Sequence, residues 1–556
     1  MRSCRFVALA LTVTFALRAQ VGVVQNAALY QQQSFLLAPN IAYVSGPVLT
    51  EGFGPVSLFL SPFAGSNIIA PRMLAVLSYF AQVISVISGQ SPVTTALPVT
   101  AALSIRPVGS TSAIPVTVIT AVAGAITFVV PAGIPLGGAE LLYKIDDQPT
   151  QWTLVNVVQS SFAFFRTGLG GPAVAQTIAA DGSLATVGLT TPAQPGQTLF
   201  LTGSGLGYGS TVTATIGGIA APVLAAGPHP TQAGHDQILI PIPASVPDGC
   251  YIPVNITVNQ TTLTTTISKT SDGSPCRHPW QLSLDDMKTL DNGGSLANGE
   301  ISLTTALTVV TSTVASRTES AGMRLSSIDA SGIAAYFPPF APAPGCVATP
   351  SNAAAIAVFR NGDFSGTVPP LPDIGASITL QNSAATLALP GNAGYFSWSA
   401  PPSTDGAINN PATSIPGGVW TWRSGGGKDL LPSSFPFTLP SGLQLNGGAP
   451  VVVKRAQDLT ISWNRASFDP AATVFLNLGG STGPPVNCTA AASAGTLTIP
   501  AALLSANVSN TIGTLTVSLN QPGSAVPHAN LKLQSGATLL MLVSYSGSDS
   551  RPVLFQ

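Results

Sequence analysis

Short apolar runs broken by glycine and proline recur along this chain, and one such pattern occurs twice. Residues 126–138 read ITFVVPAGIPLGG and residues 238–250 read ILIPIPASVPDGC, and the two align without a gap. In each copy an apolar strand runs into a proline-bounded turn, a glycine turn and a second strand. Proline ends ladder pairing and glycine permits positive φ. A repeat of about 100 residues in such a chain predicts an all-β fold of tandem Ig-like β-sandwich domains.

Beyond a linker at residues 271–281, further apolar runs continue at strand length. Strand candidates include Ser377–Leu380, Thr386–Leu389 and Val419–Trp422. Their spacing of roughly 8–12 residues again fits a sandwich. The predicted domains are a signal peptide at 1–19, an N-terminal β-rich region with the first Ig-like repeat at 20–180, a second Ig-like domain at 190–270, a β-rich domain at 282–440 and a C-terminal Ig-like β-sandwich at 441–556.

The first residues have the layout of a secretory leader. Arg2 and Arg5 precede an apolar run from Phe6 to Leu17, and small residues follow at Ala16 and Ala19. This layout predicts cleavage before Gln20 and a mature protein that is secreted and extracellular, exported from a bacterial cell. No mature segment is long and apolar enough to predict a membrane span.

Charged residues make up only 7% of the chain, against roughly 25% in an average soluble protein. Ser, Thr, Gly, Ala, Pro, Asn and Gln replace them, which favours strands and turns over helices. The formal net charge is −1, and removing the three arginines of the leader makes the mature chain about −4. A weakly acidic surface offers no electrostatic footprint for nucleic acid or anionic lipid.

Four cysteines remain after the leader is removed, namely Cys250, Cys276, Cys346 and Cys488. An even number in an oxidising compartment predicts disulfides, and three connectivities are open. A bond between Cys250 and Cys276 is favoured, because the two bracket one predicted unit. Free buried thiols are the alternative.

The segment that begins at Pro192 carries a family resemblance. It reads PAQPGQTLFLTGSGLGYGSTVTATIGGIAAPVL, and Gly234, Gln237, Ile238 and Pro243 continue the pattern. This segment resembles the IPT/TIG branch of Ig-like domains, and more closely the uncharacterised secreted β-rich proteins abundant in acidobacteria. The resemblance is good over residues 190–270 and departs from the family at His235-Asp236. It implies an Ig-like sandwich outside the cell and supplies no activity.

Two matches to catalytic or cofactor-binding motifs lack the residues or the spacing that these motifs require. A GxSxG motif at 479–483 has no acid between Ser481 and His528, and two prolines block the helix that a hydrolase needs there. The run Gly203–Gly209 is out of register for GxGxxG, and we interpret it as a flexible inter-strand loop. We therefore predict no catalytic residue and no cofactor.

Metal ligands are equally sparse in the sequence. A zinc site needs three or four converging ligands, whereas the histidines are scattered at His229, His235, His278 and His528. The acids Asp285, Asp286, Asp291 and Glu300 cluster without the alternation of a calcium loop. We predict no metal site, and an irregular calcium site in this cluster is the alternative.

Three tryptophans are candidates for stacking against sugar rings. Trp420 and Trp422 are two residues apart, so on a strand they point to one face, and Trp398 would complete the platform. Lining a sandwich core is the favoured alternative, since bulky aromatics often do so.

These observations predict a secreted, non-catalytic interaction or structural protein, such as an adhesion, surface or matrix component. Its partner would be an extracellular protein or a neutral polysaccharide, because low charge suits hydrogen bonding to neutral polymers. The alternative function is a carbohydrate-active enzyme with its site in residues 280–440, which would need two convergent carboxylates.

Overall fold

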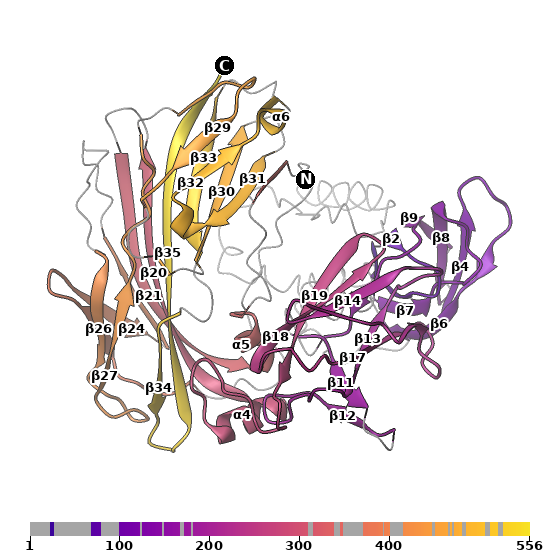
Figure 1. Ribbon diagram of the computed structural model, residues 1–556, viewed down its shortest axis with the longest axis horizontal. Helices are drawn as coiled ribbons and strands as arrows, with labels where there is room; N and C mark the ends of the chain where they lie inside the picture. Colours follow the sequence, from indigo (N-terminus) through magenta and orange to yellow (C-terminus); the bar gives the residue numbers. More distant parts are fainter. Residues whose placement is uncertain are drawn as a thin grey trace, which may run out of the picture. The chain divides into compact units, whose positions relative to one another are not determined.

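The computed structural model of the chain divides into two compact units, Met1–Ser274 (unit 1) and Pro275–Gln556 (unit 2; Figure 1). The structure describes residues 23–26, 68–78, 99–122, 125–146, 150–166, 172–178, 182–309, 315–337, 345–348, 371–392, 394–400, 415–447, 451–464, 468–469, 472–480, 485–505, 512–520 and 526–556. The expected signal peptide, residues 1–19, lies outside these residues. Strands dominate the described residues, so the all-β prediction is confirmed.

The first sandwich of unit 1 is built from β1 to β9. Its strands are β1 (Val23–Asn26), β2 (Ile68–Ile69), β3 (Leu74–Ser78), β4 (Ala101–Pro107), β5 (Ile114–Pro115), β6 (Thr117–Val122), β7 (Ala125–Val129), β8 (Gly137–Ile145) and β9 (Gln151–Val157). One sheet has the order β1-β3-β7-β6 and the other β2-β9-β8-β4-β5. This is the strand order of Ig-like domains, A-B-E-D against A′-G-F-C-C′. Apolar residues of both inner faces, including Ile105, Phe128 and Val155, form the core.

The second sandwich of unit 1 repeats this order. Its strands are β10 (Ala163–Phe164), β11 (Ala175–Ile178), β12 (Leu184–Thr186), β13 (Thr198–Ser204), β14 (Val212–Ile216), β15 (Ile219–Ala221), β16 (Ala225–Pro228), β17 (Asp236–Pro241), β18 (Gly249–Val258) and β19 (Thr261–Lys269). The sheets are β12-β11-β13-β17-β16, with β10 beside β13, and β15-β14-β18-β19. The parallel pairing of β2 with β9 recurs as a bridge between Ala193 and Lys269. The prediction of tandem Ig-like sandwiches is therefore confirmed.

The duplicated topology explains the sequence repeat. Residues 126–138 cover β7 and the turn into β8, and residues 238–250 cover β17 and the turn into β18. In both copies the chain leaves one sheet, crosses the end of the sandwich and enters the other sheet. The prolines and glycines mark this crossing, where ladder pairing must stop.

The glycine-rich run of the second sandwich is a packed loop, unlike the flexible loop that the sequence suggested. Gly207 has φ +75°, and a Cβ added there would lie 1.8 Å from the carbonyl oxygen of Gln159. A Cβ on Gly203 would lie 2.4 Å from the carbonyl oxygen of Ala163. Glycine is required here because another backbone segment lies against the loop.

Unit 2 contains a third sandwich of the same kind. Its strands are β22 (Gly345–Ala348), β28 (Val451–Val453), β29 (Leu459–Ser462), β30 (Thr473–Gly480), β31 (Val486–Ala491), β32 (Thr496–Ile499), β33 (Ile512–Asn520) and β35 (Thr538–Phe555), with the short helices η3 (Ala492–Ala494) and α6 (Ala501–Leu504). One sheet runs β22-β31-β30-β33-β35, with β28 parallel to β35, and β29 and β32 form the other. In Ig-like lettering, β28, β35, β33, β30 and β31 are strands A′, G, F, C and C′, and β29 and β32 are strands B and E.

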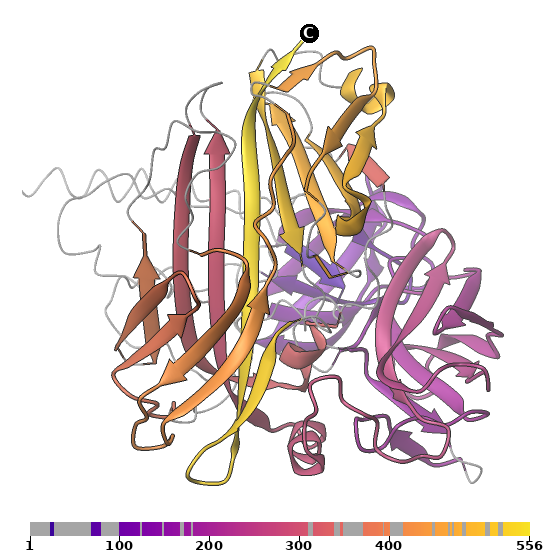
Figure 2. The ribbon, with the colours of Figure 1, turned by 60° about the vertical axis from the view of Figure 1, so that its left-hand side comes forward.

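Strand β35 also belongs to a second region of unit 2. Its first half pairs with β34 (His528–Lys532) on one side and in parallel with β20 (Ser295–Val309) on the other. From β20 the sheet continues through β21 (Ala315–Asp329), β25 (Tyr395–Ser399), β24 (Thr386–Asn392), β23 (Ser377–Gln381), β26 (Gly418–Ser424) and β27 (Ser433–Leu439). Helix α4 (Leu284–Asp291) precedes β20 and α5 (Ala330–Ala334) follows β21. Figure 2 shows β20, β21 and β35 side by side as long strands.

One hydrophobic core serves both regions of unit 2. Leu303 on β20, Trp422 on β26 and Val517 on β33 belong to the same cluster of buried side chains. Residues 282–440 and 441–556, which we expected to form separate domains, therefore share a long strand and a core.

Candidate binding surfaces

The outward face of strands β21, β20, β35 and β33 carries small hydroxyl side chains, and we call it the hydroxyl face. Side chains alternate along a strand, and the positions on this face are exposed or half-buried. Within residues 302–308, 316–322, 514–518 and 544–550, thirteen of the fifteen outward positions are Ser or Thr, and the other two are Ala306 and Gly322. The next outward positions, Glu300 on β20 and Arg324 on β21, are charged and lie opposite each other. The hydroxyl positions are Ser302, Thr304, Thr308, Ser316, Thr318, Ser320, Thr514, Thr516, Ser518, Ser544, Ser546, Ser548 and Ser550.

Strand register sets these hydroxyls in rows across the sheet. Thr304 on β20 lies opposite Ser320 on β21 and opposite Ser546 on β35. A second row crosses all four strands through Ser316, Thr308, Ser550 and Thr516. With strands about 4.8 Å apart, such a row spans about 14 Å. The sheet therefore presents a continuous two-dimensional array of hydroxyl groups.

The composition of this face is not that of the chain. Ser and Thr make up 56 and 55 of the 556 residues, a fifth of the sequence, whereas they fill thirteen of these fifteen positions. The fifteen positions carry no charge, and the row next to them at one end holds Glu300 opposite Arg324. A hydroxyl both donates and accepts hydrogen bonds. The rows of hydroxyls therefore match a ligand with its own uncharged hydroxyls, and the charges beside these rows are one acid opposite one base.

The hydroxyl face was not among our predictions, although the sequence carries a signal for it. The segment 544–550 reads SYSGSDS, and the segment 302–308 reads SLTTALT. Hydroxyls at every second residue are the period of one face of a strand. What the segments do not reveal is that β20, β21, β33 and β35 are neighbours, because that depends on pairings between residues more than 200 positions apart.

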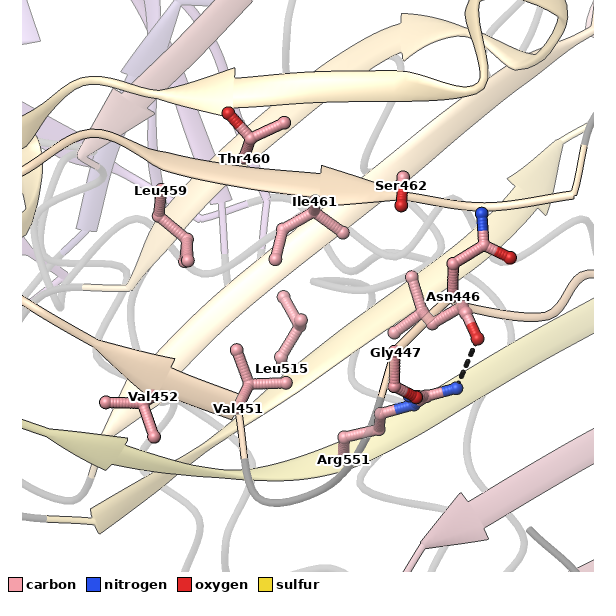
Figure 3. Close-up of a pocket in the computed structure, with 11 residues that line it drawn as sticks. Asn446, Gly447, Val451, Val452, Leu459, Thr460, Ile461, Ser462, Leu515 and Arg551 are labelled. Carbon is pink, nitrogen blue, oxygen red and sulfur yellow. Dashed lines mark hydrogen bonds between the residues drawn. The ribbon is translucent and has the colours of Figure 1, made fainter. Parts of the chain in front are cut away.

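A cavity of about 360 Å³ opens between the two sheets of the third sandwich (Figure 3). Apolar side chains of β28, β29 and β33 line it, including Val451, Ile461 and Leu515. The guanidinium of Arg551 and the backbone around Gly447 form its polar side. At this place the chain passes from the sheet that contains β29 to the sheet that contains β28, and the cavity lies at the crossing. It therefore lies between strands that do not pair with each other.

Arg551 is a structural residue at this cavity. It forms a bidentate ion pair with Asp549, with two N–O distances of 3.1 Å, and both side chains are buried. The guanidinium also donates to the carbonyl oxygens of Leu445 and Gly447. Asp549 in turn accepts from the Leu445 N–H at 2.8 Å. The pair thus fastens residues 445–447 to β35.

The three candidate stacking tryptophans do not share an exposed face in the structure. Trp420 and Trp422 are fully buried, and Trp420 donates to the carbonyl oxygen of Pro416 at 2.9 Å. Neither indole offers a face to a sugar ring, so the platform expected at Trp398, Trp420 and Trp422 is not formed. Trp420 and Trp422 instead line the core, which was the alternative that we weighed. Trp398 is partly buried and packs against the same core. Strand alternation alone could not tell the inner face from the outer.

The structure establishes the partner of two of the four cysteines. Cys346 on β22 and Cys488 on β31 lie directly opposite each other and form a disulfide, with Cα atoms 4.0 Å apart. Cys250 and Cys276 are also disulfide-bonded. Their pairing with each other stays a prediction.

Among the described residues, the candidate metal ligands do not come together in a site. Ser481 of the GxSxG motif lies outside the described residues. Within the described part of the chain, no group of three or more His, Cys, Asp or Glu side chains is placed to hold a metal ion. Acids of residues 280–440 serve the fold instead: Asp286 completes the capping box of α4, and Asp329 caps α5.

Comparisons with known proteins give neither a family nor a close relative. No protein-family model matches the chain, and no curated protein matches it. Among solved structures, a tetra-tandem repeat in the extending region of a large adhesion protein is 13% identical, with 87% of this chain and 98% of that chain covered and a TM-score of 0.14. A tandem segment of titin is 7% identical, with 67% and 94% covered and a TM-score of 0.13. At these TM-scores the likeness carries no argument.

Of the described α-helices, α4 has eight residues, α5 five and α6 four. Among the described residues, none is both long and apolar enough to cross a bilayer.

Proposed function

We propose that this chain is a secreted, non-catalytic interaction protein of a cell surface or extracellular matrix, and that its hydroxyl face binds a neutral polysaccharide. The observation that carries the proposal is the array of thirteen hydroxyls among fifteen outward positions, with Glu300 opposite Arg324 in the row at one end. A neutral polysaccharide presents the complementary donors and acceptors and no charge that would need a counterpart.

Two further features support this proposal. The disulfide between Cys346 and Cys488 suits an oxidising extracellular compartment. Three sandwiches of one strand order suit a protein that presents surfaces rather than a reaction centre. We also propose that the second sandwich belongs to the IPT/TIG branch of Ig-like domains. The Gly217-Gly218 turn between β14 and β15 supports this assignment, because both glycines adopt the positive φ that a two-residue hairpin requires.

Depletion assays with insoluble polymers test the binding. The full chain is mixed with microcrystalline cellulose, chitin or starch granules, and with pectate and heparin beads as charged comparisons. The double variant Thr304→Lys/Ser546→Lys places two cations in one row of the hydroxyl face. We expect the wild type to bind at least one neutral polymer and the variant to bind it at least tenfold more weakly, because each ammonium would have to be desolvated against an uncharged ligand.

A matched control adds the same charge elsewhere. Thr213→Lys/Thr262→Lys alters two exposed threonines of the second sandwich. We expect this control to bind like the wild type. Equal binding by the two double variants would contradict the role of the hydroxyl face, and selective capture by heparin would point to a charged ligand instead.

The enzyme alternative makes a separate prediction. A carbohydrate-active enzyme with a site in residues 280–440 would release reducing ends from the polymer that it binds. We expect none during prolonged incubation. Release that is lost when acids such as Asp373 or Asp429 are replaced by Asn would establish the alternative.

A further inference from the structure

The first sandwich of unit 1 exposes an aromatic side chain on the face of a sheet. Trp152 on β9 is 56% exposed, and Leu154, two residues further along the same strand, is 52% exposed. The residues between and beside them, Thr153 and Val155, point into the core. The indole therefore lies on the outer face of the sheet, outside the core of the sandwich.

Strand register extends this indole into a row across four strands. Trp152 lies opposite Leu142 on β8, Leu142 opposite Ser104 on β4, and Ser104 opposite Pro115 on β5. We call these four residues the Trp152 row. Figure 1 shows β9, β8 and β4 next to one another.

Polar groups border the Trp152 row along its length. Glu140 lies opposite both Leu154 and Arg106, and the Arg106 Nε lies 2.6 Å from the Glu140 carboxylate. This ion pair is half-exposed and neutral as a pair. Lys144 lies one row further along on the other side, opposite Ala102, and no charged side chain lies within the Trp152 row itself.

The second sandwich is an internal control for these residues. Its β18–β19 hairpin has the same place in the fold, and its outward pairs are Asn255 with Thr264 and Thr257 with Thr262. Thr257 and Thr262 hydrogen-bond to each other at 2.8 Å, and Asn255 donates to Thr215 at 3.0 Å. The same topology is thus built with small polar side chains, so the fold does not require a tryptophan at this place.

The size of the patch limits what it can bind. Four strands span about 14 Å, and two rows of one face are about 7 Å apart, which gives roughly 100 Å². A stable protein partner needs about 800 Å² from each side. One aromatic ring beside a fixed pair of hydrogen-bonding groups instead suits a short stretch of sugar rings. The indole packs on a ring's C–H face, and Arg106 and Glu140 can donate to and accept from its hydroxyls.

From these observations we propose that Trp152 stacks against a pyranose ring of a neutral glycan, with Arg106 and Glu140 bonding to the ring hydroxyls. The proposal rests on the proposed function for its class of ligand, but it places a second contact on a different unit from the hydroxyl face.

Soluble oligosaccharides separate the two sites. The probes are the hexamers of cellulose, chitin and amylose, titrated into the full chain by calorimetry. Three variants are compared with the wild type: Trp152→Thr, which adopts the residue type of the second sandwich; Leu184→Thr, an equally exposed apolar side chain elsewhere; and Thr304→Lys/Ser546→Lys on the hydroxyl face. We expect Trp152→Thr to weaken binding of one hexamer at this site at least tenfold and Leu184→Thr to leave it unchanged, while Thr304→Lys/Ser546→Lys reports any binding of the same hexamer at the hydroxyl face.

Fluorescence gives a second readout. Trp152 is the one tryptophan among the six of the chain that precedes residue 275. We expect the bound hexamer to protect a fraction of the emission from acrylamide quenching, and we expect this protected fraction to vanish in Trp152→Thr.

Each remaining outcome overturns the proposal. If a hexamer binds Trp152→Thr as well as the wild type, stacking at Trp152 is wrong, while sensitivity of polymer binding to Thr304→Lys/Ser546→Lys would leave the proposed function standing. Failure of every hexamer to bind also removes the Trp152 site. Loss of self-association in Trp152→Thr by sedimentation would make this face a contact between two copies of the chain.

Discussion

Units 1 and 2 use the same Ig-like strand order in two ways. In unit 1 two sandwiches each keep a core of their own. In unit 2 the last strand of the third sandwich, β35, is 18 residues long and continues into a neighbouring sheet, so one core serves both regions. The comparison teaches that extending one strand past its own sandwich merges two regions into one unit without changing the order of strands.

The two units also secure their loops by different means. Unit 1 brings backbones together at glycines, as at Gly207 against Gln159. Unit 2 fastens residues 445–447 with the buried pair of Arg551 and Asp549. We expect the following effects on the stability of the two units, from the largest to the smallest.

Breaking the buried pair in unit 2 should cost the most. Arg551→Met leaves Asp549 buried and charged without its partner, and we expect the free energy of unfolding to fall by about 3–5 kcal/mol. Urea denaturation measures the loss, and hydrogen exchange should place it in unit 2. The control is Arg455→Met, which removes a cation 5.5 Å from the centre of the Phe555 ring and should cost about 1 kcal/mol or less. Equal losses in the two variants would contradict a special role for Arg551.

The glycine contact in unit 1 offers a matched pair of substitutions. Gly207→Ala forces a Cβ against the Gln159 carbonyl at φ +75°, and we expect a loss of about 3 kcal/mol from the clash and the backbone strain together. Gly209→Ala has a similar φ of +61° with no atom within 4 Å of the added Cβ, so it should cost about 1 kcal/mol. If the two variants unfold at the same urea concentration, the close approach does not require glycine.

Lowering the pH should stabilise unit 1 through Asp236. This carboxyl is buried, and burial raises its pKa from 3.8 to about 6, although the Leu206 N–H at 2.7 Å and the nearby Arg72 oppose the rise. The folded state therefore binds the proton more tightly than the unfolded state. The stability gained is fully present below pH 3.8 and is lost as the pH rises through 6, by about 3 kcal/mol. Hydrogen exchange of unit 1, compared between the wild type and Asp236→Asn from pH 3.8 to 6, measures this loss of stability.

Lowering the pH should destabilise unit 2 through His278. Burial, with a smaller contribution from His528, lowers the pKa of His278 from 6.5 to about 4, and its Nδ1 accepts the Trp280 N–H at 3.1 Å. The neutral ring is favoured in the folded state. Its contribution is present above pH 6.5 and is lost as the pH falls towards 4, again by about 3 kcal/mol. His278→Gln should flatten this dependence in unit 2 alone, and an unchanged pH profile would contradict the assignment.

The smallest effect is expected from Trp152→Thr. The second sandwich carries Thr264 at the corresponding place, and the indole lies outside the core. We expect the unfolding free energy to change by less than about 0.5 kcal/mol. A larger loss would mean that Trp152 supports the first sandwich and would weaken its assignment as a binding residue.

Much of the fold could be predicted from local patterns. The repeat of residues 126–138 at 238–250 predicted duplicated sandwiches, because proline and glycine act locally on the backbone wherever a strand must end. The strands at Ser377–Gln381 and Gly418–Ser424 agree with runs that the sequence singled out. The glycine-rich loop was misjudged, since glycine permits both mobility and close contact and only the position of Gln159 distinguishes the two.

The candidate surfaces depended on long-range pairing. Alternation along a strand is a local property, so the chain's own letters establish that Trp420 and Trp422 share a face and that Ser544, Ser546 and Ser548 share another. Which face turns inward depends on the strands that pack against it, and that is decided by contacts between residues hundreds of positions apart. For this reason the strand pattern could be read from the sequence, while the burial of two tryptophans, the exposure of a third and the assembly of the hydroxyl face are consequences of tertiary structure alone.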